Sequence, residues 1–341
     1  MTKRIRLATI IVAATSISAV LIGCAASSGS SSDKNSISVV GFSVLKTANE
    51  PVISAFQKTD AGKDVKFTTS YGASGDQARA VIGGLHADEV HLSLEPDMTK
   101  LVDANLVDKS WNQTPTQGIL TDSVVVFLVR KGNPLHITSW DDLVKPGVKV
   151  ITPNPASSGS AKWNILAAWA HGRAESGSDA GAATFVTKLL HNTIAMPGSG
   201  ADALASFVAG NGDVLLAYEN DSIEARAAGE AVDYLIPNDT LLIQNPAAVT
   251  EDASPAAQDF LDFQLSKEGQ TLYAKAGFRP VIDGIQTEVP GVENPSDPFP
   301  KVKHLYTLDQ DFGGWAKADP EFFDENSGTI TKIISGLNIG S

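Results

Sequence analysis

The stretch that decides the fold is TPNPASSGSAKWNILAAWAHG, residues 152–172, where small residues separate a Pro-Asn-Pro turn from a Trp-bearing, amphipathic helical segment. The small residues are Ser157, Ser158, Gly159 and Ser160. One interpretation is helix capping, because serine is favoured and glycine tolerated just before a helix. The other is a binding loop, because such residues have no side chain large enough to hold a ligand away from the backbone. The pattern alone leaves both open.

The same order of a strand, small residues and a helix occurs two more times, at 70–75 (SYGASG) and at 198–200 (GSG). In open α/β sheets, ligands bind at the carboxyl ends of the strands, where helix N-termini converge. Helix N-termini present unpaired N–H groups and a partial positive charge, which together suit an anion. We therefore expect the three loops to meet around an anion.

The donors in these loops are uncharged. Ser158, Gly159 and Ser160 offer consecutive N–H groups and rotatable hydroxyls, no arginine lies in the loops, and Lys162 lies further into its helix. Such a cradle suits a small, fully ionised tetrahedral oxyanion. Sulfate has no proton at neutral pH, whereas phosphate keeps one that a carboxylate can accept. Asp76 follows the first loop and is either a partner of the helix dipole or such an acceptor.

Along the chain, apolar strand-like runs alternate with helical patterns from residue 37 onward, which predicts an α/β fold with parallel sheets. The length of 341 residues predicts roughly two domains. The run SVVVFLVRKGNP, residues 123–134, predicts a buried parallel strand or a crossover between domains.

Catalytic and metal motifs are absent from the sequence. The six histidines have no ligand spacing, and HExxH, paired cysteines, GxGxxG and GxSxG do not occur. Glu95 and Asp97 lie two residues apart, a pattern that we assign to capping or surface roles. We therefore expect no enzyme activity, no cofactor and no metal, and the alternative of a secreted hydrolase has little support.

The N-terminus predicts export. Residues 1–23 have a basic start and a short apolar run, and the motif LIGC, residues 21–24, ends in Cys24, the only cysteine of the chain. LIGC resembles the bacterial lipobox, whose cysteine is lipidated, and residues 24–36 predict a flexible, Ser-rich tether.

Beyond residue 23 the chain has 23 basic and 39 acidic residues, which argues against nucleic acid or an anionic membrane surface as partner.

These residues resemble the sulfate/thiosulfate-binding proteins that serve ABC importers, from about residue 36 to 334. The matching stretches are YGASGDQA (71–78), VFLVRKGNP (126–134), WDDLVKPGVKVITPNPASSGSAKWN (140–164), GDVLLAYEN (212–220), GFRP (277–280) and FGGWAKA (312–318). The resemblance implies a two-lobed periplasmic-binding-protein type II fold, with a mainly parallel sheet flanked by helices in each lobe. Lobe I would comprise residues 37–120 and 222–341, and lobe II residues 121–221.

The resemblance also implies the residues that hold the anion. Ser74 falls at a family serine donor and Ser158 at the principal one, Gly159 keeps its glycine, and two further positions, Ser160 and Gly200, replace a family glycine and alanine. Two positions depart from the pattern: Ser43 stands where some members have aspartate, and Tyr218 stands where some have a tryptophan whose indole N–H binds the anion. The ligand-binding set that follows is Ser43, Ser74, Ser158, Gly159, Ser160, Gly200 and Tyr218.

The function implied is that of an extracytoplasmic, lipid-anchored monomer that captures sulfate or thiosulfate and delivers it to a membrane permease complex. Another tetrahedral oxyanion, such as molybdate or phosphate, is the alternative.

Overall fold

The computed structural model describes residues 35–337. The expected signal peptide, Cys24 and almost all of the expected tether lie outside these residues. The strands are β1 (Ser36–Phe42), β2 (Lys66–Gly72), β3 (Glu89–His91), β4 (Ile119–Arg130), β5 (Val150–Ile151), β6 (Thr193–Ala195), β7 (Val214–Tyr218), β8 (Val232–Leu235), β9 (Asp239–Val249) and β10 (His304–Tyr306). The helices are α1 (Leu45–Phe56), α2 (Ser74–Ile82), α3 (Glu95–Asp103), α4 (Trp140–Leu143), α5 (Gly159–Ser176), α6 (Asp179–His191), α7 (Gly200–Val208), α8 (Glu219–Ala227), α9 (Pro255–Leu265), α10 (Lys267–Lys275), a π-helical turn η1 (Leu308–Phe312), α11 (Trp315–Phe323) and α12 (Thr329–Leu337).

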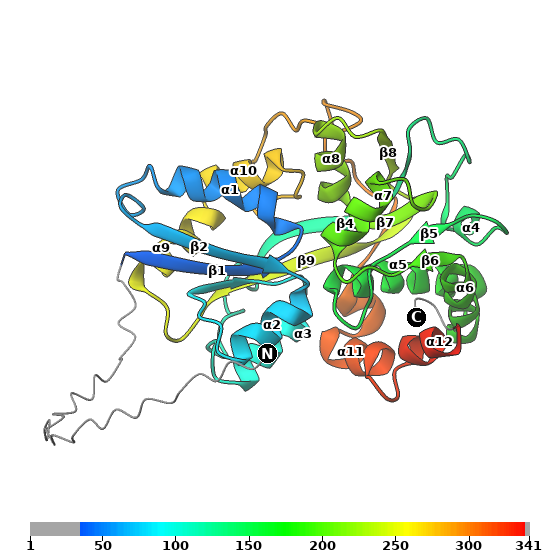
Figure 1. The fold of residues 1–341 in the computed structure, drawn as a ribbon, viewed down its shortest axis with the longest axis horizontal. Helices are drawn as coiled ribbons and strands as arrows, with labels where there is room; N and C mark the ends of the chain where they lie inside the picture. Colours follow the sequence, from blue (N-terminus) through cyan, green and yellow to red (C-terminus); the bar gives the residue numbers. More distant parts are fainter. Residues whose placement is uncertain (1–34, 338–341) are drawn as a thin grey trace, which may run out of the picture. The chain divides into compact units, whose positions relative to one another are not determined.

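The expected α/β fold is confirmed, with a mixed sheet. The strand order is β2-β1-β3-β9-β4-β7-β5-β6, with β10 beside β9 and β8 beside β4 (Figure 1). The outer strands pair in parallel, β1 with β2 and β3, and β5 with β6 and β7. The two long central strands, β4 and β9, run antiparallel to each other and to their neighbours β7 and β3.

Strand β4 is antiparallel to all its neighbours, so the parallel alternative of the sequence prediction is wrong, and the crossover between domains stays a prediction. Its first half pairs with β9, through residues 119–124, and its second half pairs with β7 and β8, through residues 125–130. It is buried along almost its whole length, which explains its continuous β-branched sequence. Strands β4 and β9 therefore connect the β2-β1-β3 group to the β7-β5-β6 group.

Helices cover both groups of strands. Helices α1, α9 and α10 pack together beside β1, whereas α5 lies against β9 and α6. Helix α5 is buried on all sides over most of its length, so the amphipathic helix expected there is wrong, because α6 and the sheet enclose it. The C-terminal helix α12 packs against α6 and α11. The lobe boundaries stay a prediction.

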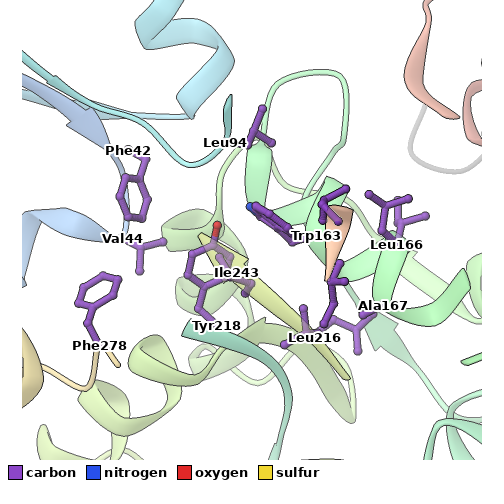
Figure 2. Close-up of a cluster of buried hydrophobic side chains, with 14 of the residues drawn as sticks. Phe42, Val44, Leu94, Trp163, Leu166, Ala167, Leu216, Tyr218, Ile243 and Phe278 are labelled. Atoms are coloured by element: carbon purple, nitrogen blue, oxygen red, sulfur yellow. The ribbon is translucent and has the colours of Figure 1, made fainter. Parts of the chain in front are cut away.

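The largest hydrophobic cluster extends across both groups of strands and includes aromatic residues from several elements. Figure 2 shows Phe42, Trp163 and Tyr218 among its side chains. Trp163 and Tyr218 are at most 1% exposed. Both residues border the loops predicted to bind an anion, so the core itself fixes those loops in place.

Candidate functional site

Helix capping accounts for only one of the three small-residue loops. At the start of α7, the Ser199 hydroxyl accepts a hydrogen bond from the Asp202 N–H, as a capping serine does. The residue before α5 is Ser158, whose side chain makes no capping hydrogen bond, and the residue before α2 is Ala73. The small residues at the starts of α2 and α5 therefore require another explanation.

The structure brings the three loops together. The Gly75 N–H, in the first turn of α2, donates to the Ser157 carbonyl just before α5, at 3.2 Å. The Ser157 hydroxyl donates to the Gly198 carbonyl before α7, at 2.7 Å. A Cβ on Gly200 would lie 2.9 Å from the Ser160 Oγ. The convergence expected from the sequence is therefore present, with Gly200 packed closely against the Ser160 side chain of α5.

Ser43 and Tyr218 lie at the same place. The Ala201 N–H at the start of α7 donates to the Ser43 Oγ at 3.4 Å, a long bond from α7 to the turn that precedes α1. Tyr218 ends β7 and is fully buried, and its hydroxyl lies 2.7 Å from the Ser93 Oγ. Burial raises the pKa of the Tyr218 phenol well above its ordinary value, so the phenol stays protonated and able to donate.

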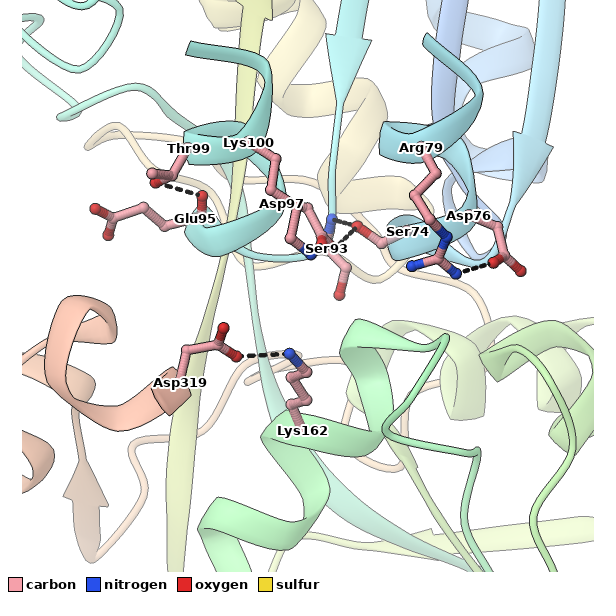
Figure 3. Close-up of polar contacts among 10 residues, drawn as sticks. All are labelled: Ser74, Asp76, Arg79, Ser93, Glu95, Asp97, Thr99, Lys100, Lys162 and Asp319. Atoms are coloured by element: carbon pink, nitrogen blue, oxygen red, sulfur yellow. Dashed lines mark hydrogen bonds and ion pairs between the residues drawn. The ribbon is translucent and has the colours of Figure 1, made fainter. Parts of the chain in front are cut away.

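The Ser74 hydroxyl already has a specific acceptor, as Figure 3 shows. It donates to the Asp97 carboxylate at 2.7 Å and accepts from the Ser93 N–H at 3.0 Å. Asp97 is 3% exposed, and its other oxygen accepts from the Lys100 ammonium at 2.9 Å. The surface or capping role expected for Asp97 is therefore wrong, because α2 and α3 pack together and enclose the carboxylate between them.

Asp76 and Lys162 are directed to partners other than an anion. Asp76 is more than half exposed and forms an ion pair with Arg79, one turn further along α2 (Figure 3). This pair places an arginine close to the first loop, since the Arg79 guanidinium lies 3.5 Å from where a Cβ on Gly75 would be. The Lys162 ammonium lies 2.6 Å from the Asp319 carboxylate of α11.

Sequence reasoning missed Ser93, which lies between β3 and α3 and is 2% exposed. A Cβ on Gly159 would lie 2.4 Å from the Ser93 Oγ, so the start of α5 is pressed against this serine. The order of strand, serine and helix that marks the other loops is present here too, because Ser93 follows β3 and precedes α3. Its neighbours, however, are leucines, so the segment lacks the run of small residues that marks the other loops.

A buried charged group lies directly after Tyr218. Glu219 is 0% exposed, and its two oxygens accept from the Arg279 guanidinium at 2.6 and 2.9 Å. The neighbouring Asp122 exchanges backbone hydrogen bonds with Arg279, and burial raises the pKa of its carboxyl to about 7. A buried ion pair therefore lies next to Tyr218 in the sequence, in which the positive charge of Arg279 balances the negative charge of Glu219.

Within residues 35–337, no group of three or more His, Cys, Asp or Glu side chains is arranged to hold a metal ion. Over the same residues, none of the helices combines the length and apolarity needed to cross a membrane. The Ser74 hydroxyl is hydrogen-bonded to the Asp97 carboxylate and to the Ser93 backbone N–H.

Comparison with known proteins places the chain among transport proteins. A family model described as bacterial extracellular solute-binding protein matches residues 37–279. The chain is 39% identical over 310 residues to a sulfate-binding protein of Synechococcus elongatus, covering 88% of this chain and 87% of that one. It is 31% identical over 296 residues to a thiosulfate-binding protein of Pseudomonas aeruginosa, covering 84% and 87%. Among solved structures, the sulfate-binding protein SubI of Mycobacterium tuberculosis is similar with a TM-score of 0.80 and 43% identity, over 85% of this chain and 100% of that chain.

Proposed function

Because this chain belongs to the family of bacterial extracellular solute-binding proteins, we propose that it captures sulfate, or thiosulfate, and delivers it to an ABC permease. The relatives named for sulfate and thiosulfate support the ligand class. The observation that carries the proposal is the meeting of three helix starts, α2, α5 and α7, through direct contacts between residues at or just before these starts. These starts direct peptide N–H groups and partial positive charge toward one place.

Serine hydroxyls and glycine N–H groups hold the anion in this proposal. Ser158 supplies the principal hydroxyl, Gly159 and Gly200 supply main-chain donors, and Ser160 adds a second hydroxyl. Hydrogen bonds to a charged group contribute on the order of 1.5–3 kcal/mol each. Much of that sum is offset by dehydration of the anion and by ordering of the protein. We expect a dissociation constant in the micromolar range or tighter.

A fully ionised oxyanion suits this site better than a protonated one. Asp76, the carboxylate that could accept a proton from phosphate, is exposed and paired with Arg79. Asp97 lies beside Ser74 and could also accept a proton from phosphate, but its two oxygens already accept hydrogen bonds from the Ser74 hydroxyl and the Lys100 ammonium. Phosphate would therefore find no vacant acceptor among these carboxylates, whereas sulfate requires none.

The remaining features of the proposal concern the whole protein. Two lobes close on the anion by a hinge in the crossover strands, and the permease binds the closed form. The protein acts as a monomer without catalysis, held to the outer face of the membrane by lipid on Cys24. Mass spectrometry of the mature N-terminus tests the lipid, since an unmodified Cys24 or a cleavage elsewhere would contradict it.

The function is tested by a thermal-shift screen of sulfate, thiosulfate, molybdate and phosphate, followed by calorimetry. A bound ligand raises the melting temperature by mass action, so we expect sulfate or thiosulfate to raise it most. Ser158→Val should abolish this shift while unfolding remains cooperative. A chain that melts at the same temperature with every oxyanion would contradict the function, and sulfate binding by Ser158→Val would show that the site lies elsewhere.

A further inference from the structure

Ser93 has hydrogen-bonding partners for every one of its polar groups, and they come from four different elements. Its N–H donates to the Ser74 Oγ at 3.0 Å. Its carbonyl accepts from the Trp163 indole N–H and from the Asn245 amide, both at 2.9 Å. Its hydroxyl lies 2.7 Å from that of Tyr218. This buried serine therefore joins the starts of α2 and α5 to strands β7 and β9.

The direction of these hydrogen bonds can be worked out from the Ser93 carbonyl. A carbonyl only accepts, so the Asn245 side chain must present its NH2 group to it. The same NH2 group lies 3.4 Å from the Tyr218 hydroxyl oxygen, which therefore accepts from it. On the other side of the amide, the Asn245 Oδ1 lies 3.3 Å from the Thr121 hydroxyl, which donates to it.

Tyr218 consequently has its proton available for a serine. The phenol is protonated and its oxygen accepts from Asn245, while its serine neighbours are the Ser93 Oγ, at 2.7 Å, and the Ser160 side chain. When the phenol donates to Ser93, one lone pair of the serine oxygen is occupied and the serine's own proton is directed elsewhere. Hydrogen bonds arranged head to tail in this way polarise one another.

The Ser93 Oγ faces the start of α5. A Cβ on Gly159 would lie 2.4 Å from it, so no side chain could stand between this hydroxyl and the first turn of the helix. Gly159 and Ser160 of that turn are among the residues proposed to hold the anion. The hydroxyl proton of Ser93 is therefore placed beside the proposed site.

We propose that Ser93 is a further donor to the bound oxyanion and that Tyr218 is a positioning residue, which directs the Ser93 proton without touching the anion. This inference rests on the proposed function. It differs from what the resemblance implies for position 218, where a tryptophan N–H binds the anion directly. In this chain, Ser93 would donate to the anion in place of the tryptophan, and Tyr218 would act by orienting Ser93.

The experiment is a double-mutant cycle with sulfate, measured by calorimetry on the wild type, Ser93→Ala, Tyr218→Phe and the double variant. Loss of Ser93 should weaken affinity by roughly 10- to 100-fold, as expected for one hydrogen bond to a charged group. Loss of the Tyr218 hydroxyl should weaken affinity by a smaller factor, because the serine keeps its proton but loses its orientation. The double variant should bind as weakly as Ser93→Ala alone.

The control is Ser254→Ala, which removes a hydroxyl of similar burial that has no hydrogen-bond partner and should leave affinity unchanged. Failure of the wild type to bind either sulfate or thiosulfate would contradict the proposed function itself. If the wild type binds, full affinity in Ser93→Ala overturns the inference. Losses that multiply in the double variant also overturn it, because Tyr218 then acts on the anion independently of Ser93, either directly or through Ser160. Equal losses in both single variants overturn it too, because they mean that only the bond between the two hydroxyls matters. Melting of each unliganded variant monitors folding, and Ser93→Gly replaces any alanine variant that does not fold.

Discussion

Replacing Gly159 by alanine tests whether close contact between α5 and Ser93 is needed for binding. The added Cβ would lie 2.4 Å from the Ser93 Oγ, 2.6 Å from its Cβ and 2.8 Å from the Leu94 Cδ2. Reaching ordinary contact at 3.4 Å requires the two segments to separate by about 1 Å. Rotating the Ser93 side chain would break the hydroxyl's bond to Tyr218 and would still leave the Ser93 Cβ 2.6 Å from the added Cβ, so the start of α5 must move.

Overpacking of this kind costs about 1–3 kcal/mol. The clash can be relieved while the two proposed lobes are open but not when they close on the anion. The whole free-energy cost of overpacking then opposes binding, and sulfate affinity drops by about 5- to 150-fold. Alanine is a better helix former than glycine, by at most about 1 kcal/mol, so helix propensity cannot be the cause of a loss.

Calorimetry with sulfate measures the change, and Gly198→Ala is the matched control. Gly198 lies in the loop before α7, where an added Cβ would meet only the Asp202 carboxylate, at 3.9 Å. We expect Gly198→Ala to bind like the wild type. If Gly159→Ala also binds like the wild type, the contact between α5 and Ser93 has no part in binding and the reasoning is refuted.

Three further predictions concern charge. Arg279→Ala should lower the free energy of unfolding by about 3–5 kcal/mol in urea, because it leaves the buried Glu219 carboxylate unpaired, and a loss below about 1 kcal/mol would contradict this. Burial raises the pKa of Glu89 to about 8, so the folded protein keeps a proton that the unfolded chain releases, and stability should fall between about pH 5 and 8. Glu89→Gln should reduce that slope in urea unfolding at several pH values, and an unchanged slope would exclude Glu89 as its source. Asp76→Asn should leave sulfate affinity unchanged and nearly constant between about pH 5 and 8 by calorimetry, because Asp76 is exposed, whereas a marked gain in affinity at acidic pH would point to a protonated ligand.

The convergence of the three loops could be predicted from the sequence because its causes are local. Small residues after a strand and before a helix mark a helix start, and the α/β alternation places such starts at one edge of the sheet. The α/β fold class follows from the same alternation. The direction of β4 could not be predicted, because a continuous apolar run has the same composition in a parallel and in an antiparallel strand.

The contacts that the sequence did not reveal are those between elements far apart in the chain. The sequence assigns Asp97 a capping or surface role because Glu95 is its one neighbouring carboxylate, and only packing between α2 and α3 buries it beside Ser74. Ser93 and Tyr218 are 125 residues apart, and nothing in either local pattern indicates that their hydroxyls meet. Single-sequence patterns report periodicity and caps, whereas these pairings depend on how the sheet is ordered.

The balance of charge around the three loops explains how an acidic protein can hold an anion. The carboxylate of Asp97 is matched by Lys100, and that of Glu219 by Arg279, within 3 Å in each pair. Because each pair is compact, its field falls off faster than that of a single charge, and the nearby peptide dipoles dominate at the helix starts. Distant surface acids are screened by salt beyond about 10 Å. On the proposed function, the net charge of −13 acts on the approach of the anion, while the neutral donors of the three loops act on its affinity at short range.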